Sequence, residues 1–443
     1  VTVTVNGTSY EVYSQIMTNS WENDLEIFSD QPWWGNNSLS VSFVEAVQAD
    51  LGLLPGHSRG ALFITSSSAS NNTNFNYWVG TGVRTTWAEG NPGYDFYAGN
   101  AETARYYYAY LQQTQLNTEW VQPYAAMQNV GLKSIDNNRD LVLAKAGECN
   151  NYGWVIGDTD YCVYTNAKNK VSYVNGDTTR GSYGSAVFNG SINVEKTIND
   201  KWKAGVAYGM GSANLYDFNF SGTTANLDSS NNHYSVYGVK KVNDIFTLKG
   251  MVGGSVFDYK GKRNYLTTSA TSSYETDGYT AEINGIWDLK KNIKNMKTPI
   301  RLQPTVGVAF AAHAQDGFSE SGSGDLITVE SNQAESLVFK TGIGIDKQIT
   351  MQQGWLLVPS LALNYEMDTY AGKSNRDIKG KATGSSDAST SVEAKTFGQH
   401  RGSVKLGADF VINKDFMFNL NAEYGLATYG DENSYGGGFR WQF

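Results

Sequence analysis

The chain has 443 residues, a formal net charge of −9 and a mean hydropathy of −0.41. This length allows two or three domains, and no stretch approaches the roughly 18 consecutive apolar residues of a membrane-spanning helix. Because the chain is acidic, it lacks the basic face that nucleic-acid binding needs, and no nucleic-acid partner is expected. The 28 Tyr, 11 Trp and 47 Gly against 7 Pro favour many long strands.

Residues 1–118 are predicted to form a small α+β domain. Alternating residues on both sides of Asn6-Gly7 predict a β-hairpin at its start, with further strands near 61–65 and 76–80. Trp33 and Trp34, in the segment Gln-Pro-Trp-Trp-Gly, are candidate interface aromatics. A binding platform is the alternative role, but packing is the commoner one for paired tryptophans.

Residues 119–148 are predicted to be a linker and a helix, the helix running over 124–147 after Pro123. Its apolar residues recur with only loosely helical spacing, and Gly131 weakens the helix prediction. Cys149 and Cys162, the two cysteines of the chain, come next. They are a disulfide candidate if the compartment is oxidising, and two reduced thiols otherwise. No metal site or cofactor is expected.

Residues 149–443 alternate between apolar and polar positions, which is typical of half-exposed strands. In 416–427, Phe416, Leu420 and Tyr424 share one face, whereas Asn419 and Glu423 share the other. We predict a mainly β fold with a 12-stranded antiparallel transmembrane β-barrel. The expected strands lie near 152–165, 181–198, 202–218, 232–242, 245–261, 275–288, 300–317, 325–345, 355–370, 390–412, 416–428 and 434–443.

The connections alternate in length along this series. Short turns are expected after the even strands, as at 199–201, 243–244 and 413–415, although 289–299 is longer and basic. Longer polar loops are expected after most odd strands, notably over 166–180, 219–231, 262–274 and 371–389. Short turns on one rim and long loops on the other are typical of an outer-membrane barrel.

The final strand places Phe439, Trp441 and Phe443 on one face. In a soluble sheet such a stripe would be an aggregation hazard, whereas in lipid it supplies the outward face of a barrel. A last strand of this kind resembles the signal by which bacterial outer-membrane barrels are recognised for assembly. The barrel-assembly machinery is therefore an expected partner.

Twelve strands after a helix, the segments Gln303–Phe310 and Leu337–Gly344, and the ending Phe-Arg-Trp-Gln-Phe together resemble the translocator domain of autotransporters, the type V secretion proteins. The resemblance covers about 120–443. Residues 1–118 loosely resemble small secreted cyanobacterial domains with the Gln-Pro-Trp-Trp-Gly motif, which carry no known activity.

The autotransporter resemblance implies that the helix threads the pore. Its cations would then meet carboxylates of the barrel lumen. The residues in question are Lys133, Arg139 and Lys145 on the helix and Glu366, Asp409 and Glu423 on the strands. Asn137 and Asn138 are also on the helix. Some autotransporters release their passenger by self-cleavage at such an Asn, but polar residues on a wet pore helix are the favoured interpretation.

The sequence favours an autotransporter-like outer-membrane protein whose barrel displays a small non-enzymatic domain at the cell surface, for surface structure or adhesion. The alternative is an outer-membrane channel or structural barrel whose N-terminal domain is periplasmic or plugs the pore. An enzyme is not expected, because residues 1–118 contain one histidine, His57, and no Gly-x-Ser-x-Gly elbow. Expected partners are outer-membrane lipid, lipopolysaccharide and neighbouring copies in an oligomer or surface array.

Overall fold

The computed structural model describes residues 118–148 and most of 160–442, with short gaps at 266–267, 290–299, 324–325, 352–353, 384–388 and 414. Before residue 118 it describes five short strands. Thr118–Thr383 together with Ser389–Phe443 form one compact unit, and residues 1–117 belong to another. Within the described residues, no helix is both long and apolar enough to cross a membrane.

In the first unit, β1 (Thr2–Val5) and β2 (Thr8–Glu11) pair antiparallel with Val5 opposite Thr8, the register of the predicted hairpin. A three-stranded antiparallel sheet contains β3 (Phe63–Ser67), β4 (Asn74–Val79) and β5 (Asp95–Asn100). Trp33, Trp34 and His57 lie outside the described residues.

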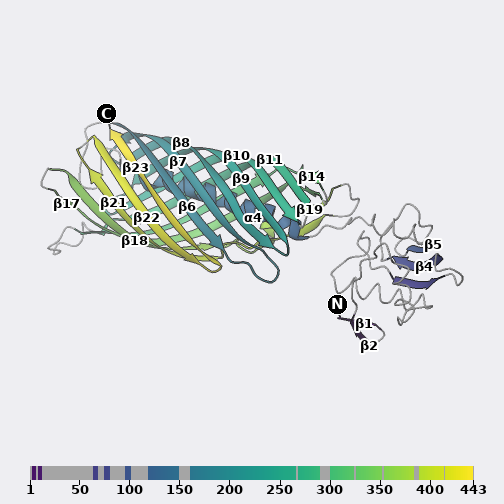
Figure 1. The fold of residues 1–443 in the computed structure, drawn as a ribbon. Coiled ribbons are helices and arrows are strands. Elements are labelled where there is room, and N and C mark those ends of the chain that lie inside the picture. Colours follow the sequence, from purple (N-terminus) through teal and green to yellow (C-terminus); the bar gives the residue numbers. More distant parts are fainter. Residues whose placement is uncertain are drawn as a thin grey trace. The chain divides into compact units, whose positions relative to one another are not determined.

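The second unit is a closed 12-stranded antiparallel barrel (Figure 1). Each strand pairs with its neighbours in sequence, and the last strand pairs with the first, with Gln442 opposite Cys162. The strands are β6 (Tyr161–Val174), β7 (Ser182–Asn199), β8 (Trp202–Phe220), β9 (Thr223–Lys241), β10 (Phe246–Tyr265), β11 (Thr268–Trp287), β12 (Ile300–Gln315), β16 (Asn332–Lys347), β18 (Leu356–Asp368), β21 (His400–Val411), β22 (Phe416–Ala427) and β23 (Gly430–Gln442).

The barrel is apolar outside and polar inside, the reverse of a soluble protein. On β22, Leu420 is 57% exposed on the outer face while the adjacent Asn419 is only 7% exposed. On β21, Leu406 points outward and Ser403 is buried within. A closed barrel leaves no unpaired strand edge, so an apolar outer face can be covered by lipid.

Shorter elements lie in the connections at the two rims of the barrel. A second sheet has the strand order β13 (Phe318–Ser319), β15 (Ile327–Val329), β19 (Ile378–Ala382) and β20 (Thr390–Val392). Its strands come from the two longest connections, between β12 and β16 and between β18 and β21, and it contacts the helix described below. The remaining short elements are β14 (Ser321–Ser323), β17 (Ile349–Thr350) and the 3-10 helix η3 (Ser374–Arg376).

The short turns between strands lie on the rim opposite to this second sheet, called the turn rim below. Three of these turns share one hydrogen-bonding pattern. The side-chain oxygens of Asn199, Asn243 and Asn413 each accept two backbone N–H groups, two and three residues further on, at 2.8–3.0 Å. An Asn side chain that bonds the backbone ahead of it imitates a turn. This chemistry explains why the short-turn prediction worked at these positions.

Two of the predicted long loops are wrong. Residues 219–231 and 262–274 instead extend β8 to β11, and β8 and β9 are joined by a turn at Ser221 and Gly222, which have φ of 50° and 84°. The inward positions of the extension from 223 to 231 remain buried, but its outward positions include Asn226 and Asp228. The apolar alternation therefore disappears although the strand continues.

The first strand was also placed too early, since β6 begins at Tyr161 and runs to Val174, through half of the loop expected at 166–180. The helix, α4, covers Thr118–Ala144 rather than 124–147. Pro123 therefore lies inside the helix, in its second turn, where it cannot donate the intrahelical hydrogen bond to the carbonyl of Glu119.

Candidate functional site: a lumen filled by a charged helix

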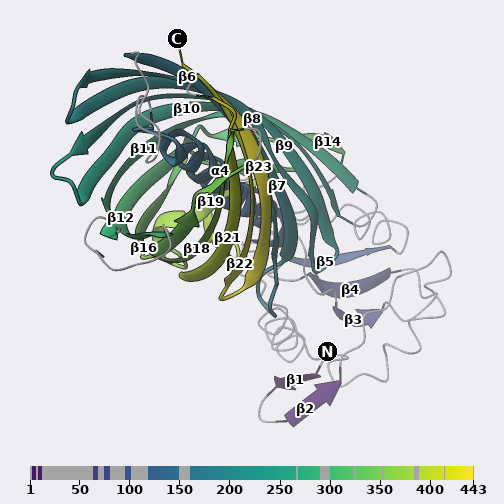
Figure 2. The same ribbon diagram turned by 90° about the vertical axis from the view of Figure 1, so that its left-hand side faces the viewer.

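Helix α4 lies inside the barrel, surrounded by strands (Figure 2). It is buried on all sides: Trp120, Met127 and Ile135 are at most 1% exposed, and so are the polar Ser134 and Asn137. A helix that is polar and yet buried all round needs a polar environment, because unpaired polar groups are costly to bury. The inward face of the barrel supplies that environment.

Arg139 anchors the C-terminal third of the helix. Its guanidinium contacts the carboxylates of Asp136 on the same helix and Glu282 on β11, and donates to Thr280 at 3.2 Å. Lys340 on β16 approaches Glu282 at 3.0 Å and Asp140 at 3.4 Å. Charged groups of opposite sign thus alternate between the helix and the barrel wall. Their mutual attraction compensates the free-energy cost of removing each charge from water.

A second cluster centres on Arg401 of β21. Its guanidinium lies 2.7 Å from Glu366, 3.1 Å from Glu423 and 2.6 Å from Glu432, on β18, β22 and β23. Glu432 is also 3.4 Å from Lys133 of the helix. This arginine therefore links three carboxylates of the barrel wall, and one of them reaches the helix.

The segment that directly follows the helix is held by barrel side chains. Lys203 donates to the carbonyl of Gly147 at 2.7 Å and Arg440 to that of Glu148 at 2.7 Å, while Glu195 accepts the N–H of Gly147 at 2.7 Å. These cations satisfy carbonyls just beyond Ala144, the last helical residue, and they complement the helix dipole. Lys145 adds an ion pair with Asp409 at 2.9 Å.

The N-terminal end of the helix is held by the long connections on the other rim of the barrel, called the loop rim below. Gln122 donates to the carbonyl of Thr179 and accepts from the N–H of Gly181, both at 2.9 Å. Tyr124 donates to Glu320 at 2.6 Å, and Glu320 also receives Arg263 at 2.6 and 2.8 Å. The helix therefore runs from the loop rim at its start to the turn rim at its end.

The loop between β6 and β7 is also joined to the connection between β18 and β21. Asp177 pairs with Lys395 at 2.5 Å and with Arg180 at 3.1 Å, and Arg180 reaches Glu393 at 3.1 Å. The hydrogen bond from Lys395, followed by that from the Thr179 backbone, holds the pKa of Asp177 below its usual range.

Steric fit reinforces the charge pattern. A Cβ on Gly131 would lie 2.5 Å from Nε2 of His313 and 2.7 Å from the hydroxyl of Tyr259, so the helix backbone approaches this wall directly. Conversely, a Cβ on Gly209 of β8 would lie 2.3 Å from Oδ1 of Asn138. Gly131, which weakened the helix prediction, is therefore required by packing.

The expected lumen residues all lie at the interface between helix and wall or on the inner wall. Lys145 meets Asp409, but Lys133 and Arg139 meet Glu432 and Glu282 rather than the carboxylates expected from the sequence. Glu366 and Glu423 pair with Arg401, and Glu423 also with Lys168 at 3.1 Å.

The remaining candidates are placed as follows. Asn137 donates to the carbonyl of Lys168 at 3.2 Å, and Cys162 is buried and disulfide-bonded. Its candidate partner Cys149 lies outside the described residues, so the pairing stays a prediction, and Phe443 lies outside them too. Phe439 and Trp441 are 44% and 59% exposed on the outer face of β23.

Sequence reasoning missed Arg401, Glu432, Glu195 and Lys340. Glu195 and Lys340 follow the outward apolar residues Val194 and Phe339, so their inward direction was readable. The neighbours of Arg401 and Glu432 are polar residues or glycine and give no such signal. The partners of all four depend on strand register. A narrow cavity of about 100 Å³ remains between the helix and the second cluster, lined by Lys133, Asp136 and Arg401 among others. Within the described part of the chain, no cluster of ligating side chains suits a metal ion.

The model of the autotransporter β-domain family matches residues 163–423, more than half of the chain. The chain belongs to this family. Its barrel is an outer-membrane translocator domain of the type V secretion class. The fold is similar to the translocator domain of the autotransporter NalP from Neisseria meningitidis, at 15% identity and a TM-score of 0.55, covering 74% of this chain and 100% of that one.

Two further solved structures are similar to this autotransporter chain. The β-domain of the Bordetella autotransporter BrkA is 14% identical with a TM-score of 0.49, covering 64% of this chain and 100% of that chain. The transport unit of AIDA-I from Escherichia coli is 15% identical with a TM-score of 0.49, covering 71% and 99%. None of the curated protein sequences matches this chain.

Proposed function

We propose that this autotransporter anchors residues 1–117 at the cell surface as a small non-enzymatic domain that serves in surface structure or adhesion. The direction of α4 carries the proposal. Gln122 and Tyr124 contact the rim with the longest connections, whereas Gly147 contacts side chains near the turn rim. Long loops of outer-membrane barrels face outward, so the chain before Thr118 would emerge outside.

The non-enzymatic part of the proposal rests on the residues of the first unit. A hydrolase of the Ser-His-Asp type needs a positioned base, and His57 is the single histidine in this unit. A lumen filled by α4 argues against the alternative function, a channel. We further propose that lipopolysaccharide surrounds the loop rim, that the assembly machinery recognises β23, and that neighbouring copies associate at the surface.

The test places protease-cleavable epitope tags at three positions on intact cells. One tag follows Ser221 in the loop rim, one follows Asn243 in the turn rim, and one stands at Asn117. We expect external protease to remove the tags at Ser221 and Asn117 while that at Asn243 survives until the outer membrane is opened.

Protection of the Asn117 tag together with the Asn243 tag would contradict display and favour a periplasmic domain. For the enzymatic question, intact cells are labelled with a fluorophosphonate probe. Labelling of residues 1–117 that disappears in His57→Ala would contradict the non-enzymatic assignment.

A further inference from the structure

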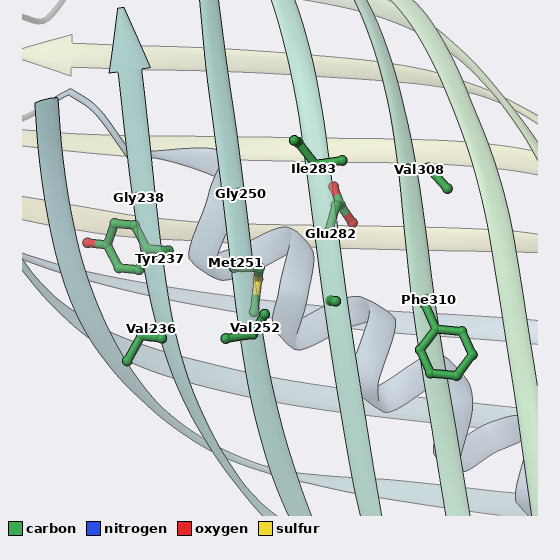
Figure 3. Close-up of a pocket in the computed structure, with 11 residues that line it drawn as sticks. Val236, Tyr237, Gly238, Gly250, Met251, Val252, Glu282, Ile283, Val308 and Phe310 are labelled. Carbon is green, nitrogen blue, oxygen red and sulfur yellow. The ribbon is translucent and has the colours of Figure 1, made fainter. Parts of the chain in front are cut away.

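A hollow of about 520 Å³ lies on the outer face of the barrel across β9, β10, β11 and β12 (Figure 3). Val236, Val252 and Ile283 stand around it and are 50–55% exposed. Gly238 and Gly250 form part of its lining and lie directly opposite each other in the antiparallel register. The hollow therefore faces the lipid, with the backbone uncovered where the two glycines meet.

Packing within the chain does not require these glycines. A Cβ on Gly238 would come no closer than 3.8 Å to Lys203 O, and one on Gly250 no closer than 3.4 Å to Glu282 O. Both are ordinary contacts, and neither glycine has a positive φ. A glycine in the interior of a strand weakens the strand. Where it does not form part of a β-bulge, it often marks a position at which another molecule approaches the backbone closely.

A cation lies beyond the lining residues of the hollow, toward the turn rim. Lys240 follows Gly238 on the same outward face of β9, about 7 Å further toward the turn rim at the usual strand rise. Its ammonium lies 4.8 Å from the centre of the Trp202 ring, on the adjacent strand. Trp marks the interface between hydrocarbon and headgroups, and lysine side chains extend to that level. An apolar hollow thus leads to a positive charge at headgroup depth.

We propose that the hollow and Lys240 bind one phospholipid of the leaflet on the turn side. One acyl chain lies over Gly238 and Gly250, and the phosphate pairs with Lys240. Since surrounding lipid is equally apolar, the selectivity comes from close packing and from the phosphate contact. The site is independent of what the first unit does.

The test is native mass spectrometry of the purified full chain titrated with phosphatidylglycerol. Gly250→Phe fills the hollow, and Lys240→Gln removes the charge. Gly402→Phe is the matched control, because Gly402 is also exposed and a Cβ there meets nothing within 4 Å. Lys260→Gln, exposed on β10, is the control for the charge.

We expect one saturable lipid in the wild type and in both controls. Lys240→Gln should weaken its apparent Kd about fivefold, since one lysine near an anionic lipid surface contributes about 1 kcal/mol, and Gly250→Phe should abolish the saturable step. Altered gel mobility on heating verifies that each variant is folded.

Three results would overturn the proposal. The first is lipid binding without saturation in the wild type, which means annular lipid only. The second is equal binding by Gly250→Phe and Gly402→Phe. The third is a dimer that Gly250→Phe dissociates, which would assign the hollow to a second copy of the chain.

Discussion

Arg401→Met is expected to lower the free energy of unfolding of the barrel by about 3–5 kcal/mol, the usual cost of removing one partner from a buried ion pair. Arg401 forms ion pairs with Glu366, Glu423 and Glu432, and the side chains of Glu423 and Glu432 are only 9% and 3% exposed. Methionine retains the apolar volume but leaves three neighbouring carboxylates to repel one another. The measurement is guanidinium unfolding in detergent, followed by tryptophan fluorescence.

Arg180→Met is the matched control. Arg180 also contacts two carboxylates, but its side chain is 27% exposed and theirs are each 30% exposed. Such partly exposed pairs contribute about 0–1 kcal/mol. If both variants lose the same stability, the cluster around Arg401 does not hold the barrel wall together.

Gly131→Leu is expected to displace α4 and to open the lumen. Replacing glycine in a helix gains about 1 kcal/mol of intrinsic propensity, but overpacking a filled interior costs about 1–3 kcal/mol. Here the clash falls on His313, whose ring is held by Tyr259 at 2.8 Å and Thr276 at 3.0 Å and cannot move freely. The steric cost should therefore prevail, and planar-bilayer recordings should show a higher conductance than wild type.

Ala144→Leu adds the same side chain to the exposed last residue of α4 and should leave the conductance unchanged. An unaltered conductance in Gly131→Leu, with a normally folded barrel, would show that the helix does not depend on close contact with His313.

The barrel could be predicted from the sequence because lipid imposes a strict alternation on each spanning strand. The alternation of Phe416, Leu420 and Tyr424 against Asn419 and Glu423 located β22 almost to the residue. It failed where strands leave the lipid, as at 223–231, because outward positions such as Asp228 then meet water and need not be apolar.

The lumen was only partly predictable for a different reason. Alternation shows which residues face inward, so Asp409 and Glu423 were recognised. It does not fix strand register or the rotation of the helix, and these decide that Glu432 rather than Glu366 meets Lys133. The backbone contacts of Lys203 and Arg440 with the segment that follows the helix leave no signal in the sequence.

The most direct test of a helix inside the lumen is a cysteine cross-link between Ser134 of α4 and Asn189 of β7. Ser134 Oγ lies 3.3 Å from Asn189 Oδ1, and both residues are fully buried. In the purified Ser134→Cys/Asn189→Cys protein we expect a disulfide to form on mild oxidation and to alter gel mobility, whereas neither single variant should change. Absence of the cross-link in a folded barrel would contradict the placement of the helix in the lumen.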